Sequence, residues 1–156
     1  MQATFKLVKL EPWHLASIEI QEHQKYFEAR CKNPAYRVAL AKDGGGITGI
    51  LDHGPDVPPT IVGIAGIMPY EEGVGYGWSV LSKHFPKYAF RITKLIKEYC
   101  KEQLAENYHR IEIQAQDDFL PATRWAEMLG FEFESVRKQA SPFRDDMRVY
   151  VMLRED

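Results

Sequence analysis

The chain has 156 residues and a formal net charge of −2, with 45% hydrophobic and 27% charged residues. These values predict one globular domain and exclude a disordered chain, a collagen-like chain and a coiled coil. The charge argues against a protein that coats nucleic acid. Two cysteines, Cys31 and Cys100, are too few for a disulfide framework and fit a reducing compartment. Apolar stretches stay far below the roughly 20 residues of a membrane helix, and the N-terminus lacks the apolar core of a signal peptide, so we expect a cytoplasmic protein with no membrane partner.

The first third of the chain predicts a strand, a long helix and a second strand. Apolar and polar residues alternate over Thr4–Lys9, as in a half-buried strand. A helix is expected to begin at Glu11-Pro12, with proline in its first turn, and to end at Asn33-Pro34. Its apolar residues recur at helical spacing. The apolar run Tyr36–Ala41 predicts a short strand.

The middle of the chain combines a loop-like segment with two clear strands. Glycines and prolines crowd the stretch from 43 to 59, which predicts a loop with a brief strand at Ile47–Leu51. We therefore expect Gly44–Pro59 to be the most mobile internal segment. Thr60–Met68 is rich in Ile and Val and lies between prolines, and Val74–Leu81 follows it, so both predict strands.

From Pro86 the apolar period changes from two residues to 3.6, which predicts an amphipathic helix to about Ala105. Arg110–Gln116 alternates as a strand. Phe131–Arg137 and Met147–Leu153 predict two closing strands.

A short helix is expected between the strand at 110–116 and the closing strands. Asp118 is a suitable N-cap, and Pro121 fits the first turn. Trp125 and Leu129 should be buried against the sheet. Gly130 stands where a helix C-terminus favours a positive φ.

The order β-α-β-β-β-α-β-α-β-β is similar to the fold of the GCN5-related N-acetyltransferases (GNAT), over nearly the whole chain. The segment Pro121–Phe131 resembles the family's short helix, which typically ends in Leu-Gly-Phe. Tyr76–Leu81 and the following helix resemble the acetyl-CoA-binding strand and helix. The resemblance implies an α/β (α+β) fold with a mixed, mostly antiparallel sheet of six to seven strands flanked by helices. Small GNAT-like proteins of tailed bacteriophages are the most similar in character.

The sequence departs from the family pattern at chemically important positions. The family signature Gln/Arg-x-x-Gly-x-Gly/Ala is in register with His84–Ala89, and only the final small residue is retained. The family glycine lets backbone N–H groups approach a pyrophosphate at the helix N-terminus, and Lys87 stands in its place. The Asn and the Tyr general acid that the family often has are replaced by Phe119 and Ala126.

The resemblance implies acetyl-CoA as co-substrate, bound along the strand and at the start of the helix. Lys83, His84 and Lys87 stand at a helix N-terminus, where cations oppose the macrodipole unless an anion lies between them and the backbone. Either the CoA pyrophosphate is that anion, or no anion binds there and these residues form a solvated helix face. Single-stranded nucleic acid is a weaker alternative. The residues expected to bind the cofactor are Val80, Leu81, Ser82, Lys83, His84, Lys87 and Ala89.

An acetyltransferase of this kind needs a general base to accept a proton from the amine. Glu71 and Glu72 lie at the mouth of the central strand and are the first candidates, against a solvated turn as the alternative. Tyr76 is the candidate acid. The second choices are Glu112 and Asp117 as bases and Tyr150 as acid, and tyrosines on strands usually serve packing.

Other chemistries are excluded by their missing motifs. The sequence has no Gly-x-Ser-x-Gly, no His-Glu-x-x-His and no Cys-x-x-Cys, and its histidines are dispersed, so no metal site is predicted. Gly73-x-Gly75-x-Gly77 lacks the spacing of a phosphate loop and is interpreted as a turn and a thin strand face.

Two functions remain open from the sequence. The first is an acetyl-CoA-dependent N-acetyltransferase that acts on an unidentified small-molecule or protein amine. The second is a catalytically inactive GNAT-fold structural or interaction module, with a homodimer or a phage assembly as its partner, in the host cytoplasm or the virion.

Overall fold

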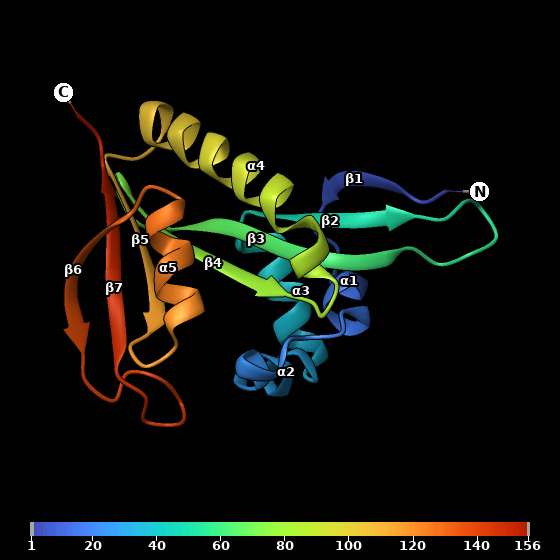
Figure 1. The fold of residues 1–156 in the computed structure, drawn as a ribbon, viewed down its shortest axis with the longest axis horizontal. Helices are drawn as coiled ribbons and strands as arrows, with labels where there is room; N and C mark the ends of the chain where they lie inside the picture. Colours follow the sequence, from blue (N-terminus) through green and yellow to red (C-terminus); the bar gives the residue numbers. More distant parts are fainter. Residues whose placement is uncertain (1, 156) are drawn as a thin grey trace. The chain divides into compact units, whose positions relative to one another are not determined.

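The computed structural model describes residues 2–155, except for the side chains of Lys25 and Tyr26. Its strands form one seven-stranded sheet in the order β1-β2-β3-β4-β5-β7-β6 (Figure 1). All registered strand pairs are antiparallel except β4 with β5, where Val74–Tyr76 pair in parallel with Arg110–Glu112. The elements are β1 (Thr4–Lys9), α1 (Pro12–Ser17), a 3₁₀ turn η1 (Glu22–Gln24), α2 (Lys25–Cys31), α3 (Pro34–Asp43), β2 (Gly46–Asp52), β3 (Thr60–Glu71), β4 (Val74–Leu81), α4 (Phe85–Glu106), β5 (Arg110–Gln116), α5 (Leu120–Met128), β6 (Glu132–Arg137) and β7 (Met147–Leu153).

The chain divides into two compact units. The first contains the residues up to Gly66 together with Ser79–Phe90. In it, β2 pairs with β1 on one edge and with β3 on the other. Val62 and Val80 are fully buried, and Leu15 of α1 is 2% exposed. This unit therefore carries the end of β4 and the first residues of α4 on a buried apolar support.

The second unit contains Ile67–Trp78 and the residues from Arg91 onward. Its strand β7 pairs with β5 on one edge and with β6 on the other. One cluster of buried side chains joins α4, α5 and the strands; its members are Ile67, Cys100, Leu104, Ile111, Ala115, Ala126, Leu129, Phe131 and Tyr150. The apolar stripe predicted for α4 supplies Cys100 and Leu104 to this core, as an amphipathic helix should.

The strongest sequence periodicities are confirmed. Four predicted strands have the bounds expected of them, namely β1, β4, β5 and β7, and α4 begins one residue before Pro86. The expected sheet of six to seven strands is confirmed at seven. Gly130 has φ +98°, so the predicted positive φ after α5 is also present.

The single long helix predicted from Glu11-Pro12 is wrong. Helix α1 ends at Ser17, because Ile18 is extended with ψ 132°. Ile20 then makes an isolated antiparallel bridge to Ser82, and helical structure resumes only at η1 and α2. Pairing with the end of β4 thus overrides the helical spacing of the apolar residues.

The strand predicted at Tyr36–Ala41 is wrong as well, because those residues lie in α3. The side chain of Asn33 accepts a hydrogen bond from the N–H of Ala35 at 2.9 Å, and Pro34 occupies the first turn. Asn-Pro was interpreted as the end of one helix, but it caps the start of the next.

Of the two predictions from local composition, the strand within the glycine-rich segment is present and the helix cap differs. The brief strand expected at Ile47–Leu51 is confirmed as β2, which is paired along both edges, whereas the N-cap expected at Asp118 is wrong. Sheet pairing on both sides stabilises the glycine-rich strand. Helix α5 begins after Phe119 rather than after an Asp118 cap, and no side chain caps it.

Trp125 lies closer to the surface than expected. Leu129 is 3% exposed, as predicted, but Trp125 is only partly buried at the edge of the core cluster. Its indole N–H donates to Oγ1 of Thr93 on α4 at 2.8 Å. Trp125 therefore joins α5 to α4, and its polar edge finds the partner that a half-buried indole needs.

Candidate functional site

The residues expected to bind acetyl-CoA lie at the end of β4, in the loop that follows it and in the first turn and a half of α4. Val80 and Ser82 are fully buried, Leu81 is 7% exposed, and Lys83 and His84 are exposed. The N–H of Ser82 donates to the carbonyl of Val62 at 3.1 Å, so it points toward β3. Because backbone groups of successive strand residues point to opposite edges, the N–H of Leu81 lies on the edge away from β3.

That edge of β4 is occupied by residues 19–24, which we call the cover segment. The N–H of Leu81 donates to Oε1 of Gln24 at 2.8 Å, and Nε2 of Gln24 donates to the carbonyl of Ser79 at 2.9 Å. The N–H of Gln21 donates to the carbonyl of Leu81 at 3.0 Å. The cover segment thus satisfies the backbone groups that the resemblance assigns to the pantetheine arm.

The backbone amides after β4 also have acceptors within the protein. The N–H of Lys83 donates to the carbonyl of Glu19 at 3.0 Å. The N–H of His84 donates to Oγ of Ser82 at 3.0 Å, and that of Phe85 donates to the Ser82 carbonyl at 3.1 Å. Pro86 has no N–H. An anion at this point would therefore be held mainly by side chains rather than by a cradle of amides.

The cations at the helix start have an acidic neighbour of their own. Nζ of Lys83 lies 3.5 Å from Oε2 of Glu19, and Nε2 of His84 lies 3.6 Å from Oε1 of the same carboxylate. Nζ of Lys87 lies 5.8 Å from the centre of the Tyr88 ring. The Lys83 and Glu19 side chains are 68% and 60% exposed, so this pair contributes well below about 1 kcal/mol and leaves the cations open to a stronger anion.

The first candidates for acid–base chemistry are not grouped with the cofactor candidates. Glu71 ends β3 and Glu72 lies in the turn before β4, and both are exposed. Tyr76 is half-buried early in β4 and is registered opposite Glu112. The cofactor candidates begin with Val80 near the other end of the same strand.

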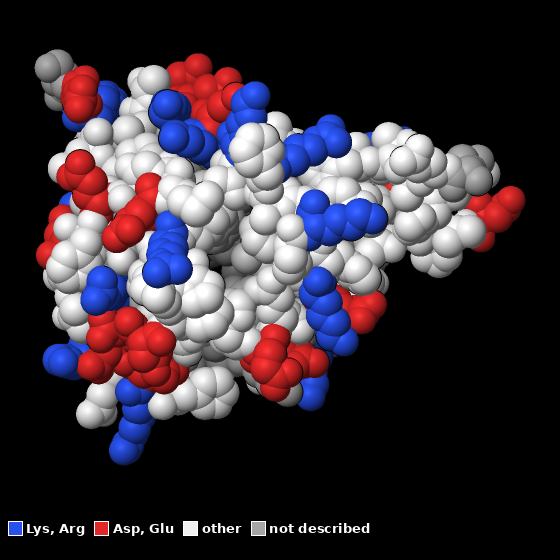
Figure 2. Space-filling model, in the orientation of Figure 1, with Lys and Arg blue, Asp and Glu red and all other residues white. Residues whose placement is uncertain are grey.

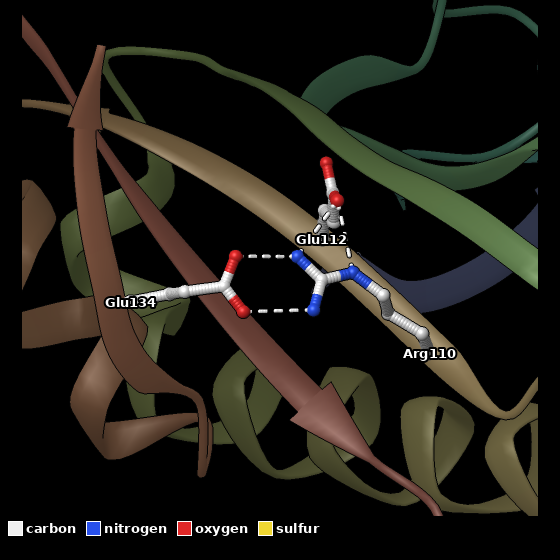
Figure 3. A network of polar contacts seen from close by, with 3 residues as sticks. All are labelled: Arg110, Glu112 and Glu134. Carbon is white, nitrogen blue, oxygen red and sulfur yellow. Dashed lines mark hydrogen bonds and ion pairs between the residues drawn. The ribbon is translucent and has the colours of Figure 1, made fainter.

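The second-choice bases take part in ion pairs, and Figure 3 shows the one that contains Glu112. Nε of Arg110 donates to Oε1 of Glu112 at 2.9 Å, while its two terminal nitrogens bind both carboxylate oxygens of Glu134 at 2.8 and 2.6 Å. The hydrogen bonds from Arg110 lower the pKa of Glu134. Asp117 accepts from Nε of Arg148 at 2.6 Å. Both Glu112 and Asp117 are thus held as partners of arginines.

The buried and glycine positions that could suggest chemistry have structural explanations. The Tyr150 side chain is fully buried in the core cluster. Gly73 has φ +78° in the turn before β4, and a Cβ at Gly77 would approach Ile113 Cγ2 to 2.7 Å. The interpretation of this glycine series as a turn and a thin strand face is confirmed.

The surface carries both signs of charge. Basic and acidic side chains are interspersed on the face drawn in Figure 2. Within residues 2–155, no cluster of three or more His, Cys, Asp or Glu side chains could hold a metal ion. No helix in the same range is long and apolar enough to span a membrane.

Sequence reasoning missed the two polar residues that contact the candidate site most directly. Glu19 and Gln24 fall in the span predicted as one continuous helix. Their contacts join positions 55 to 65 residues apart in the chain. No local pattern signals such pairing.

The fold is that of known acetyltransferases. No protein-family model matches the sequence, and no curated protein matches it. A GNAT-family acetyltransferase from Bacillus anthracis superposes with a TM-score of 0.68 at 20% identity, covering 98% of each chain. A putative acetyltransferase from Acinetobacter baylyi gives 0.74 at 12% identity, covering 98% of this chain and 94% of that one. The microcin C7 self-immunity acetyltransferase, solved with acetyl-CoA and AMP, gives 0.68 at 15% identity, covering 96% and 92%.

Proposed function

We propose that this GNAT-fold chain is an acyl-CoA-dependent N-acyltransferase that moves an acetyl group from acetyl-CoA to an amine. The observation that carries the proposal is the end of β4. There, the N–H of Leu81 and the carbonyl of Ser79 lie on the edge away from β3, directly before the cationic start of α4. The same fold in the microcin immunity acetyltransferase was solved with acetyl-CoA and AMP. Backbone N–H and carbonyl groups along one strand edge, followed by a cationic loop, suit a ligand that carries amides and phosphates.

The residues have separate roles in this proposal. Lys83, His84 and Lys87 attract the phosphates, since charge-assisted contacts are roughly twice as strong as neutral ones. Buried Val80 and Ser82 and the small side chain of Ala89 shape the surface beside them. The N–H of Leu81 and the carbonyl of Ser79 bind the amides of the pantetheine arm, as an added strand would.

The reaction is a direct acyl transfer. The amine nitrogen attacks the thioester carbon, the new C–N bond forms, the C–S bond breaks, and CoA leaves as the thiolate. A general base takes the amine proton, for which Glu72 and Glu71 remain the proposed groups. Tyr76 is the proposed acid that returns a proton to the thiolate. The amine is either a small molecule or a protein group.

Calorimetric titration with acetyl-CoA tests the proposal. We expect binding at micromolar to low millimolar ligand, followed by thiol release when a panel of polyamines and peptides is added. Glu72→Gln should lower the rate of thiol release with little effect on acetyl-CoA affinity. Absence of any binding at millimolar acetyl-CoA and low salt would refute the proposal.

One observation favours a second function. The amides of Ser82, Lys83, His84 and Phe85 all donate within the protein, and a proline follows them. A GNAT fold whose amides at this point are not available to a phosphate would suit a structural or interaction module, such as a phage assembly protein or a homodimer in the cytoplasm. Failure to bind acetyl-CoA, together with a stable dimer in sedimentation, would favour this module.

A further inference from the structure

The side chain of Gln24 imitates a ligand on β4. It comes from the 3₁₀ turn η1, is 9% exposed, and reaches the strand edge through its carboxamide. Its oxygen accepts from the N–H of Leu81 at 2.8 Å, and its nitrogen donates to the carbonyl of Ser79 at 2.9 Å. One amide group thus binds a donor and an acceptor two residues apart on the same strand edge. An added strand would bind the same groups in the same way.

A pantetheine arm offers the same chemistry. It carries two secondary amides, each with one carbonyl and one N–H. A secondary amide points its N–H and its carbonyl in opposite directions, so the N–H of one amide would bind the Ser79 carbonyl and the carbonyl of the other would bind the Leu81 N–H. Both can do so only when the Gln24 carboxamide has left these groups. The bond at Leu81 is buried and the bond at Ser79 is part-buried. An unpaired donor or acceptor there is costly, so one occupant or the other should be bound at all times.

We propose that Gln24 is an access residue, whose carboxamide holds the acyl-CoA-binding edge of β4 closed and is exchanged for the two ligand amides on binding. This inference rests on the proposed acyltransferase function and deepens it. The exchange keeps the hydrogen-bond count unchanged, because the two bonds lost by Gln24 are replaced by two from the ligand. The affinity of the protein for acyl-CoA is therefore reduced by the free energy needed to release Gln24.

The local structure allows this release without unfolding the neighbouring contacts. Gln24 reaches β4 through its side chain, whereas Gln21 reaches it through its backbone N–H, which donates to the carbonyl of Leu81. Ile20 is bridged to Ser82 by backbone pairing. A change of side-chain rotamer at Gln24 can open the edge while the backbone pairing of the cover segment is kept.

The test compares acetyl-CoA affinity in the wild type, Gln24→Ala and the matched control Gln21→Ala. Removing the competing carboxamide should tighten acetyl-CoA binding about tenfold, since two neutral hydrogen bonds no longer have to be broken. Gln21→Ala retains its backbone bond and should bind as the wild type does. Equal or weaker binding by Gln24→Ala, while the wild type binds, would overturn the inference and leave the proposed function standing. No binding by any of the three proteins would overturn both.

A measurement on the wild type covers the case in which Gln24→Ala does not fold. The carboxamide N–H signals of Gln24 can be followed by nuclear magnetic resonance during titration with acetyl-CoA. Release should shift them to the position of a solvent-exposed glutamine and accelerate their exchange with water. Signals that stay protected and unshifted at saturating acetyl-CoA would show that Gln24 keeps its place on β4, and the inference would be wrong.

Discussion

His14 is a buried histidine with a defined tautomer. Its side chain is 1% exposed, and its Nδ1 lies 3.0 Å from the N–H of Glu11 and 2.8 Å from Oγ1 of Thr48. Because the Glu11 N–H can only donate, Nδ1 must accept, so the neutral ring carries its proton on Nε2. Burial lowers the pKa of His14 from its ordinary value of 6.5, against a smaller opposite effect of the Glu11 carboxylate.

This lowered pKa predicts a loss of stability in mild acid. Below about pH 6.5, His14 is protonated in the unfolded chain but stays neutral in the folded one. The free energy of unfolding therefore falls with decreasing pH until the pKa of folded His14 is reached. His14→Asn keeps an acceptor near the Nδ1 position and should flatten this pH dependence between pH 7 and 5 in urea titrations. His109→Asn, at an exposed histidine, is the matched control and should leave it unchanged. A wild-type stability that is level across this range would contradict the prediction.

Trp125 predicts a measurable coupling between α5 and α4. Trp125→Ala should cost about 3 kcal/mol, at the lower end for a large aromatic because the ring is only partly buried. Trp125→Phe and Thr93→Val each remove the 2.8 Å hydrogen bond and should cost about 1 kcal/mol. In a double-mutant cycle the second change should add little to the first. Fully additive effects would show that this bond does not contribute to folding.

At the level of elements, the start of α4 predicts which side chains hold a phosphate. Lys83→Ala with Lys87→Ala should weaken CoA binding by tens-fold, because each charge-assisted contact is worth roughly 1.5–3 kcal/mol. Lys94→Ala with Lys101→Ala removes the same charge further along α4 and serves as the control. Folding should change little, since the Lys83–Glu19 pair is largely exposed.

Salt provides the check on this prediction. Binding of CoA to the wild type should weaken as ionic strength rises, while the Lys83/Lys87 variant should show a shallower dependence. If this variant binds CoA as well as the Lys94/Lys101 control does, the pyrophosphate does not lie at the start of α4, whatever the activity of the protein.

Elements were predictable from the sequence where their own residues determine them. The amphipathic stripe of α4 and the alternation in β1, β5 and β7 need no distant partner to be recognised. The brief strand expected at Ile47–Leu51 is present as β2, where pairing on both edges supports a segment that contains glycines. By contrast, the helix expected through 18–21 is interrupted because Ile20 pairs with Ser82. There, local preference is overridden by a contact distant in the sequence.

The candidate site was predictable only in part, for the same reason. Lys83, His84 and Lys87 follow from the helix start, and the sequence even raises the question of which anion they face. One answer, the Glu19 carboxylate, lies 64 residues earlier in the chain than Lys83. The role of Gln24 depends on two hydrogen bonds to the backbone of β4. Almost every residue type carries the same backbone groups, so the sequence of β4 does not reveal these bonds.

At the scale of the whole molecule, ligand binding should appear as added thermal stability. A ligand that binds only the folded chain stabilises it by RT ln(1 + [L]/Kd), about 2.7 kcal/mol at a hundredfold excess over Kd. For a chain of 156 residues this corresponds to a rise in Tm of about 5–10 °C. Acetyl-CoA should produce this rise in calorimetric or fluorescence melts.

Fragments of acetyl-CoA divide that stabilisation between the two parts of the site. Adenosine diphosphate probes the cations at the start of α4, and pantetheine probes the edge of β4 held by Gln24. Pantetheine alone must displace the carboxamide without the help of the phosphates, so it should raise the Tm of the wild type little and that of Gln24→Ala more. Adenosine diphosphate should act equally on both proteins, because its contacts do not involve Gln24. If pantetheine instead raises the Tm of the two proteins equally, while acetyl-CoA raises it clearly, that result would place the pantetheine arm away from this edge.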